Sequence, residues 1–312
     1  MFRYLSLRLM LGLLLCGNVQ SATLPSGDYK YALDVEGRSR SYLVHVPLRA
    51  PQGPLPVVIN LHGGGGSAEQ HRKSSRMDNA ADRDGYIAVY PNGTGILKDR
   101  LLTWNAGNCC GYSQQHHVND VLFISRMIED LKLRANVDPS RIYVAGHSNG
   151  GMMAHKIGEE LPDQVAAIAS VAGAHIPETH GVRAVSVLHI HSVDDPRAIY
   201  EGGLGPPFPL TSNRVLHPSV QDTISAWVKL DGCDAVPIEG RQFASGGHTA
   251  TEQRYSNCQD GAEVVLFKLT GAGHGWPGGV PMLEGLVGPA TQVIDANTEI
   301  WRFFSRHTLP SQ

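Results

Sequence analysis

The fold is decided by one stretch near the middle of the chain, RIYVAGHSNGG at residues 141–151. Its first half has the apolar pattern of a buried strand, and residues 152–160 can form a helix. The segment GHSNG between them fits G-x-S-x-G, a sharp turn whose crowding requires glycine on both sides of an exposed serine. The sequence therefore predicts that Ser148 is a nucleophile held between a strand and a helix.

Apolar runs alternate with helical patterns along the rest of the chain. This alternation predicts an α/β fold with a mostly parallel central sheet flanked by helices. Strands are predicted at 41–46, 56–61, 86–90, 141–145, 165–171, 185–191 and 263–269, with the first at an edge of the sheet. Helices are predicted up to about residue 84 and at 118–131, 152–160, 219–230 and 291–306, and Asp138-Pro139 is expected to break the chain.

Three stretches have no periodicity, and each follows the C-terminal end of a predicted strand: residues 91–116, 196–218 and 273–289. Long irregular loops in a compact fold are usually functional, and open α/β sheets bind ligands at this edge. No internal repeat, low-complexity tract or linker is visible, so residues 22–312 are predicted to form one catalytic domain.

The first 21 residues have the pattern of a secretory signal peptide, with two arginines, an apolar run and small residues before an expected cleavage after Ser21. A lipid anchor on Cys16 is the alternative, but Leu15 is bulkier than the residue expected before a lipidated cysteine. No later segment reaches the roughly 18 apolar residues of a membrane span. We therefore expect a secreted or periplasmic protein without a membrane partner once the signal is removed.

The formal net charge is −3, and no basic stripe of the kind that binds nucleic acid is present. Four cysteines follow the signal: Cys109, Cys110, Cys233 and Cys258. In an oxidising compartment an even number suggests two disulfides, but a bond between neighbours is strained, so all three connectivities stay open. The spacing matches no zinc motif, and no metal site is predicted. The oligomeric state stays open.

A serine needs a base to remove its proton, and the base should follow in the chain order Ser, acid, His. His274 lies in GAGHGWP at 271–277, directly after the strand at 263–269. His217, His248 and His307 have no strand directly before them and are expected to be solvated surface residues. We therefore predict that His274 is the base.

The acid should follow the preceding strand, at 185–191, where Asp194 and Asp195 stand side by side. The pattern of the strand does not separate the two. His189 and His191 alternate along this strand and are predicted to be packed core or rim residues. An oxyanion hole is predicted from the backbone N–H groups of Asn149 and of Gly63 in HGGGG at 62–66, where no Lys-Ser/Thr follows to indicate phosphate binding.

These motifs resemble the secreted esterase family of polyhydroxybutyrate depolymerases and feruloyl esterases. The matching segments are LHGGGG at 61–66, TWNAGNCCG at 103–111, NDVLF at 119–123, GHSNGG at 146–151 and GHGWPGG at 273–279. The resemblance implies an α/β-hydrolase fold, a carboxylic ester substrate, an acyl-enzyme on Ser148 and no cofactor. The family's His-Gly-x-x-Asp-Pro pattern fits residues 191–196 and implies Asp195 as the acid, although Ser192 replaces the glycine and Asp194 stays a second candidate.

Trp104 and Trp276 lie in two of the long loops and are predicted to be exposed and to bind substrate, with a structural role as the alternative. The family divides between feruloyl-type esters and hydroxyalkanoate polyesters. The chain ends soon after its last helix without an appended binding domain, which favours soluble aromatic or short acyl esters. A serine peptidase and a non-catalytic binding module on the same fold are the alternatives, and the complete set of Ser, Asp and His argues against the module.

Overall fold

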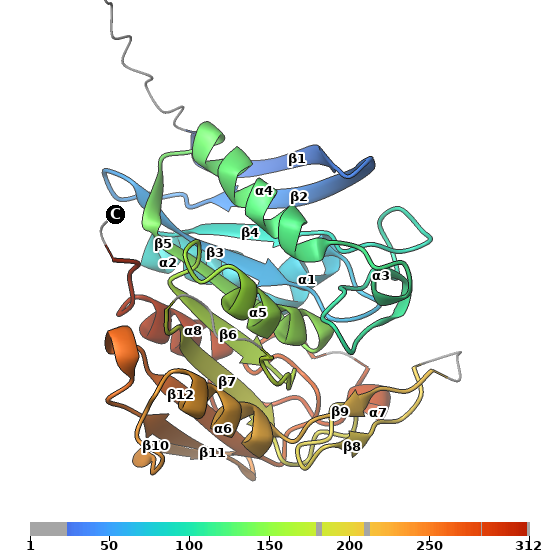
Figure 1. The fold of residues 1–312 in the computed structure, drawn as a ribbon, viewed down its shortest axis with the longest axis vertical. Coiled ribbons are helices and arrows are strands. Elements are labelled where there is room, and N and C mark those ends of the chain that lie inside the picture. Colours follow the sequence, from blue (N-terminus) through green and yellow to red (C-terminus); the bar gives the residue numbers. More distant parts are fainter. Residues whose placement is uncertain (1–23, 179–182, 209–212, 282, 311–312) are drawn as a thin grey trace, which may run out of the picture.

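The structure is a computed structural model that describes residues 24–178, 183–208, 213–281 and 283–310 (Figure 1). The predicted signal peptide lies outside the described residues. At the centre is a sheet of ten strands. In spatial order they are β1 (Gly27–Val35), β2 (Arg38–Val46), β4 (Ile87–Pro91), β3 (Leu55–Leu61), β5 (Val137–His147), β6 (Ala167–Val171), β7 (Ser186–Ser192), β12 (Val264–Thr270), β11 (His248–Tyr255) and β10 (Ile238–Ser245).

The six middle strands, from β4 to β12 in this order, are parallel. An antiparallel hairpin extends each side, β1–β2 next to β4 and β11–β10 next to β12. This arrangement confirms the predicted mostly parallel sheet. A separate pair of two-residue strands, β8 (Gly203–Leu204) and β9 (Leu216–His217), lies within the second long loop.

Helices cover both faces of the sheet (Figure 1). One face carries α4 (Asp120–Arg134), α5 (Asn149–Glu160) and α6 (Val220–Leu230), and the other carries α1 (Ala68–Ser75), α2 (Met77–Asp84) and α8 (Ala296–Phe304). Short helices α3 (Gly111–Gln115) and α7 (Glu284–Val287) lie in loops. Because side chains alternate along a strand, β7 contributes Val187 to one hydrophobic core and Leu188 and Ile190 to the other.

The sequence prediction missed the outer strands. The segment 41–46 was expected at an edge, which is wrong, because β1 pairs with β2 and covers it. The tyrosines and leucine of β1 alternate with polar residues, a pattern that could have identified this strand. The hairpin β10–β11 turns at Gly246-Gly247, both with positive φ, a two-glycine signal that could also have been used.

Three predicted boundaries also differ. The expected break at Asp138-Pro139 is wrong, because β5 begins at Val137 and its pairing with β3 shifts register between Leu55 and Val57, which accommodates a residue without an N–H. The helix expected up to residue 84 is divided at Arg76, where φ is 55°. The last helix begins at Ala296 rather than near 291, because the Asp295 side chain accepts a hydrogen bond from the Thr298 N–H (2.7 Å) and caps it.

The parallel strands bring the predicted site residues to one edge of the sheet. The glycine loop follows β3, Ser148 follows β5, Asp195 follows β7 and His274 follows β12. These strands are neighbours in space or separated by one strand, so segments distant in sequence meet at their carboxyl ends. In the described part of the chain, none of the helices has the length and apolar character needed to cross a bilayer.

A buried ion pair joins the N-terminal hairpin to α4. Arg40 of β2 donates to Asp120 at 2.6 Å, and both side chains are buried. We expect Asp120→Asn to lower the free energy of unfolding by about 3–5 kcal/mol, because it leaves the Arg40 charge buried without a counter-charge. Urea denaturation of the purified protein measures this change.

The matched control is Lys73→Ala, which removes a solvent-exposed pair with Glu69 on α1. We expect a change of about 0.3–0.5 kcal/mol there. Equal effects of the two substitutions would contradict the view that the Arg40–Asp120 pair couples the hairpin to the fold.

Candidate active site

Ser148 lies at the turn between β5 and α5 in a backbone conformation that few residues adopt, with φ 56° and ψ −121°. Its N–H donates to the Val171 carbonyl at 2.8 Å, and its carbonyl accepts from the Met152 N–H at 2.9 Å. The turn has no room for larger neighbours, since a Cβ on Gly146 would lie 2.2 Å from the Gly150 oxygen. The predicted strand-turn-helix is confirmed, and it presents the serine above the sheet.

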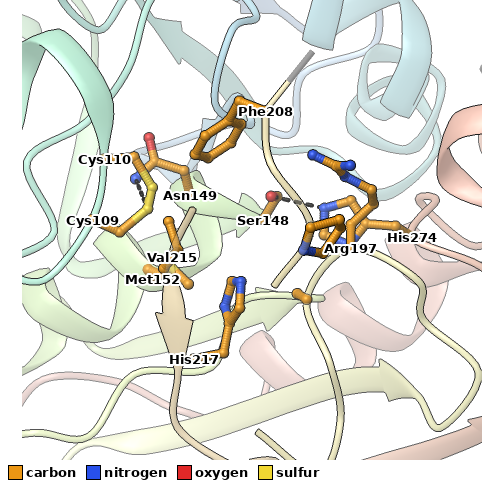
Figure 2. Close-up of a pocket in the computed structure, with 12 residues that line it drawn as sticks. Cys109, Cys110, Ser148, Asn149, Met152, Arg197, Phe208, Val215, His217 and His274 are labelled. Carbon is orange, nitrogen blue, oxygen red and sulfur yellow. Dashed lines mark hydrogen bonds between the residues drawn. A yellow bond between two sulfur atoms is a disulfide. The ribbon is translucent and has the colours of Figure 1, made fainter. Parts of the chain in front are cut away.

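Three side chains from different loops form a line at this turn. The His274 Nε2 lies 2.8 Å from the Ser148 Oγ, and the His274 Nδ1 lies 2.6 Å from the Asp195 Oδ2 (Figure 2 shows the serine and the histidine). Since a carboxylate only accepts, Nδ1 carries the hydrogen, and Nε2 is free to accept the serine proton. The arrangement can activate a serine hydroxyl.

Asp195 is held as an anion. Its Oδ1 accepts from the backbone N–H groups of Arg197 (2.7 Å) and Ala198 (2.9 Å). Burial acts to raise the pKa of Asp195, but the neighbouring His274 and the hydrogen bonds from His191 and His274 outweigh burial and hold this pKa well below its usual range. Asp194 is exposed and instead accepts from the Gly271 N–H at 2.6 Å. Of the two candidates, only Asp195 contacts His274.

A second histidine, His147, holds the loop that carries His274. His147 directly precedes Ser148, and its Nε2 donates to the His274 carbonyl at 3.0 Å. Burial lowers the pKa of His147 to about 3, with the neighbouring His274 as a further cause, so His147 is neutral at physiological pH. This bond fixes the backbone of the loop that carries His274.

The glycine loop after β3 approaches Ser148 closely. A Cβ on Gly63 would lie 3.4 Å from the Ser148 Cβ and 3.2 Å from the His147 Nδ1. His62 fixes the loop, since its Nδ1 donates to the Gly63 carbonyl (2.8 Å) and its Nε2 accepts from the Gly93 N–H (3.0 Å). On the opposite side, Asn149 begins α5, where backbone N–H groups have no partner within the helix. The two predicted oxyanion donors therefore lie on segments that adjoin the serine.

The expectation that Trp104 and Trp276 are exposed is wrong. Trp104 is fully buried, and its Nε1 donates to the His62 carbonyl at 2.8 Å. Trp276 is 8% exposed, and its Nε1 donates to Asn297 at 3.1 Å. Both indoles pack against other elements, Trp104 against the His62 ring and Trp276 against the His71 ring, because each has an apolar body and a buried partner for its N–H. Trp104 thus supports the glycine loop. This is the structural role that the sequence analysis gave as the alternative to substrate binding.

Two pockets open beside Ser148. One, of about 40 Å³, is lined by the Cys109–Cys110 disulfide together with Met152, Phe208, Val215 and His217 (Figure 2). The other, of about 200 Å³, is lined by the glycine loop and by Leu283, Leu286 and Val287. Arg197 lines both pockets. An ester bound to the serine thus has apolar walls on two sides.

Sequence reasoning assigned no role to several of these lining residues. His217 was expected to be solvated but lines the smaller pocket, where burial lowers its pKa to about 4. Phe208 and Val215 share its loop, 196–218, which was predicted to be functional only as a whole. The cysteines pair as Cys109–Cys110 and Cys233–Cys258, one of the three connectivities considered.

One cluster of described residues has the ligand types of a metal site: Asp28, His45 and Asp78. The Arg72 guanidinium lies 2.6 Å from Asp28 and 2.6 Å from Asp78, so a cation already pairs with each carboxylate. These residues come from β1, β2 and α2 rather than from the loops around Ser148. The cluster is therefore an ion-pair network outside the site.

Known proteins of similar sequence and fold are esterases. A family model described as "Esterase PHB depolymerase" matches residues 40–252. The chain belongs to this family. NocK from Nocardia uniformis subsp. tsuyamanensis, named an esterase, is 31% identical over 287 residues, which are 85% of this chain and 79% of NocK. Membership of the family identifies the chain as a carboxylic ester hydrolase.

Feruloyl esterase B from Piromyces equi is 30% identical over 225 residues, which are 70% of this chain but only 39% of that protein. Among solved structures, an acetyl xylan esterase from Aspergillus awamori is similar with a TM-score of 0.57 at 14% identity, over 89% of this chain and 99% of that one. At this identity the likeness concerns the fold alone, which is that of the α/β-hydrolases.

The two neighbouring aspartates give a direct test of the site. We expect Asp195→Asn to lower kcat by about 10⁴-fold, because an amide no longer fixes the tautomer of His274. Asp194→Asn keeps an acceptor oxygen for the Gly271 N–H, and we expect kcat within about tenfold of the unsubstituted enzyme. Steady-state kinetics on p-nitrophenyl butyrate compare the two, and a larger loss in Asp194→Asn would show that the acid is misassigned.

Proposed function

We propose that the protein is an exported serine esterase that works through an acyl-enzyme on Ser148. The observation that carries this proposal is the continuous line from Ser148 Oγ through His274 to Asp195, with bonds of 2.8 and 2.6 Å and open space beside the serine. Family membership supports an ester as the substrate.

Each step uses a group of this chain. Ser148 attacks the ester carbonyl while His274 takes its proton, and Asp195 stabilises the resulting imidazolium. The backbone N–H groups of Asn149 and Gly63 stabilise the developing oxyanion. The imidazolium then protonates the leaving alcohol. A water molecule, activated by the same histidine, releases the acid and restores the serine.

We further propose that the substrate is a small soluble ester with an aromatic or short acyl group, of the feruloyl type, with hydroxyalkanoate esters as the alternative. The pockets support this, because Met152, Phe208 and Val215 give an apolar wall beside the serine and Leu283 and Leu286 give another. The relative named feruloyl esterase B supports the aromatic choice.

We also propose export to the periplasm or the medium, with residues 1–21 acting as the signal peptide. The two disulfides support this location, since such bonds persist in oxidising compartments.

A rate comparison tests the proposed function. We expect methyl ferulate and p-nitrophenyl butyrate to be hydrolysed with higher kcat/KM than an oligomer of hydroxybutyrate. We expect Ser148→Ala to lower kcat on the best ester by at least about 10⁴-fold, because water alone then has to attack. A preference for a peptide amide over every ester would overturn the proposal.

A further inference from the structure

A row of three buried histidines extends from Asp195 into the core, away from the serine. We call His155, His189 and His191 the histidine row. His189 and His191 are two residues apart on β7 and therefore face the same side of the sheet, and His155 reaches them from α5. All three are at most 1% exposed. Trp227 of α6 closes the far end of the row.

Adjacent rings of the row lie within hydrogen-bond distance. Trp227 Nε1 lies 2.9 Å from His155 Nδ1, and His155 Nε2 lies 3.2 Å from His189 Nδ1. His189 Nε2 lies 3.0 Å from His191 Nδ1. At the near end, His191 Nε2 lies 2.8 Å from the Ala198 carbonyl and 3.3 Å from the Asp195 Oδ2.

The chemistry of the two ends fixes the direction of every bond. An indole N–H only donates, so His155 Nδ1 accepts from Trp227 and the hydrogen of this ring is on Nε2. It follows that His189 accepts at Nδ1 and carries its hydrogen on Nε2, and that His191 does the same. At the other end a carbonyl and a carboxylate only accept, which independently requires the hydrogen on Nε2 of His191. Both ends give the same direction, towards Asp195.

This direction leaves no place for a second proton on His191. Its Nδ1 already faces the N–H of His189, and a hydrogen there would oppose another hydrogen. Burial, with like-charge neighbours as a lesser cause, lowers the pKa of His155 to about 3 and that of His189 well below its usual range. His155 and His189 are therefore neutral, although the row ends at a carboxylate that would favour an imidazolium on His191.

We propose that Trp227, His155 and His189 keep His191 neutral, so that the negative charge of Asp195 remains available to His274. His191 is then a positioning residue: its Nε2–H donates to the Ala198 carbonyl and lies 3.3 Å from the Asp195 Oδ2, without competing as a cation. A protonated His191 would pair with Asp195 and weaken the stabilisation of the imidazolium that forms on His274. This inference rests on the proposed function of the Ser148 site.

Among the described residues, few charged or titratable groups outside the row lie near it. Around His191 they are Asp195, His147, His217 and Tyr200, whose ring lies edge-on at 5.8 Å. At the far end, Glu159 and His175 lie near His155, with a ring separation of 6.4 Å between the two histidines. Around His274 they are Asp195, His147, His217 and Arg197. Only the row contacts the Nδ1 of His191 among these groups.

Two substitutions remove the constraint without touching Asp195. In His189→Gln the amide can turn its oxygen towards His191 Nδ1 and so accept a second hydrogen. In Trp227→Phe the donor at the far end is lost, and the row can reverse its direction when His191 takes up a proton. Tyr143→Phe is the matched control, because it removes a buried donor to the His307 carbonyl outside the row.

The readout is the acid side of the pH profile of kcat/KM on p-nitrophenyl butyrate. With one required deprotonation, on His274, the logarithm of kcat/KM falls with a slope of about one in the unsubstituted enzyme and in Tyr143→Phe. In His189→Gln and Trp227→Phe a second proton on His191 steepens the slope towards about two. A merely structural role of the row would lower activity at all pH values and leave the slope unchanged, which would overturn the proposal.

Nuclear magnetic resonance of the unsubstituted protein with ¹⁵N-labelled histidine tests the row directly and does not depend on the folding of a variant. We expect His155, His189 and His191 to show the neutral Nε2–H form from about pH 5 to 9. A cationic or Nδ1–H form of His191 in this range would overturn the proposal even if ester hydrolysis is normal. Absence of ester hydrolysis, with the row in the expected form, would instead reject the proposed function.

Discussion

The site depends on one constraint, the left-handed backbone of Ser148 at the turn between β5 and α5. The turn is closed on all sides: a Cβ on Gly150 would lie 2.4 Å from the Leu61 oxygen, and one on Gly173 would lie 2.3 Å from the Ser148 oxygen. The glycines thus let β3, β5 and the segment after β6 meet around a single residue. The conformation costs energy that the surrounding parallel strands offset, and the result is a serine hydroxyl presented above the sheet.

The electrostatics of the site follow from burial. One carboxylate, Asp195, is kept ionised by two backbone N–H groups and two imidazoles. Burial lowers the pKa of His147 and of His189 far enough that both stay neutral. A fixed negative charge on Asp195 stabilises the imidazolium that forms on His274. The neutral hydrogen-bond donors around Asp195 are already oriented, so they need not rearrange when the positive charge develops. The histidine row extends this environment to α5 and α6.

Much of the fold and of the site could be predicted from the sequence, because the patterns that indicate them are local. A buried strand, two glycines and a helix identify Ser148 within residues 141–160, and the order of strands then places Asp195 and His274 at the same edge. The hairpin β10–β11 was missed because β10 is largely exposed and lacks a clear apolar face. The burial of Trp104 could not be predicted, since it depends on the path of a long loop beneath the glycine loop.

The histidine row shows a second limit of prediction from the sequence. His189 and His191 could be assigned to a packed face of β7 from their spacing alone, and they are buried there. Their partners, His155 and Trp227, lie on two helices distant in sequence, and only the folded arrangement of α5, α6 and β7 brings them together. Hydrogen-bond direction is a property of the whole row, so no local pattern could indicate it.

Covalent labelling shows directly whether Ser148 is the nucleophile. The folded protein is treated with a fluorophosphonate, digested and analysed by mass spectrometry. We expect one adduct per chain, on the peptide that contains Ser148, and none in Ser148→Ala. A stable adduct on another residue, or ester hydrolysis by protein that the reagent does not label, would contradict this assignment.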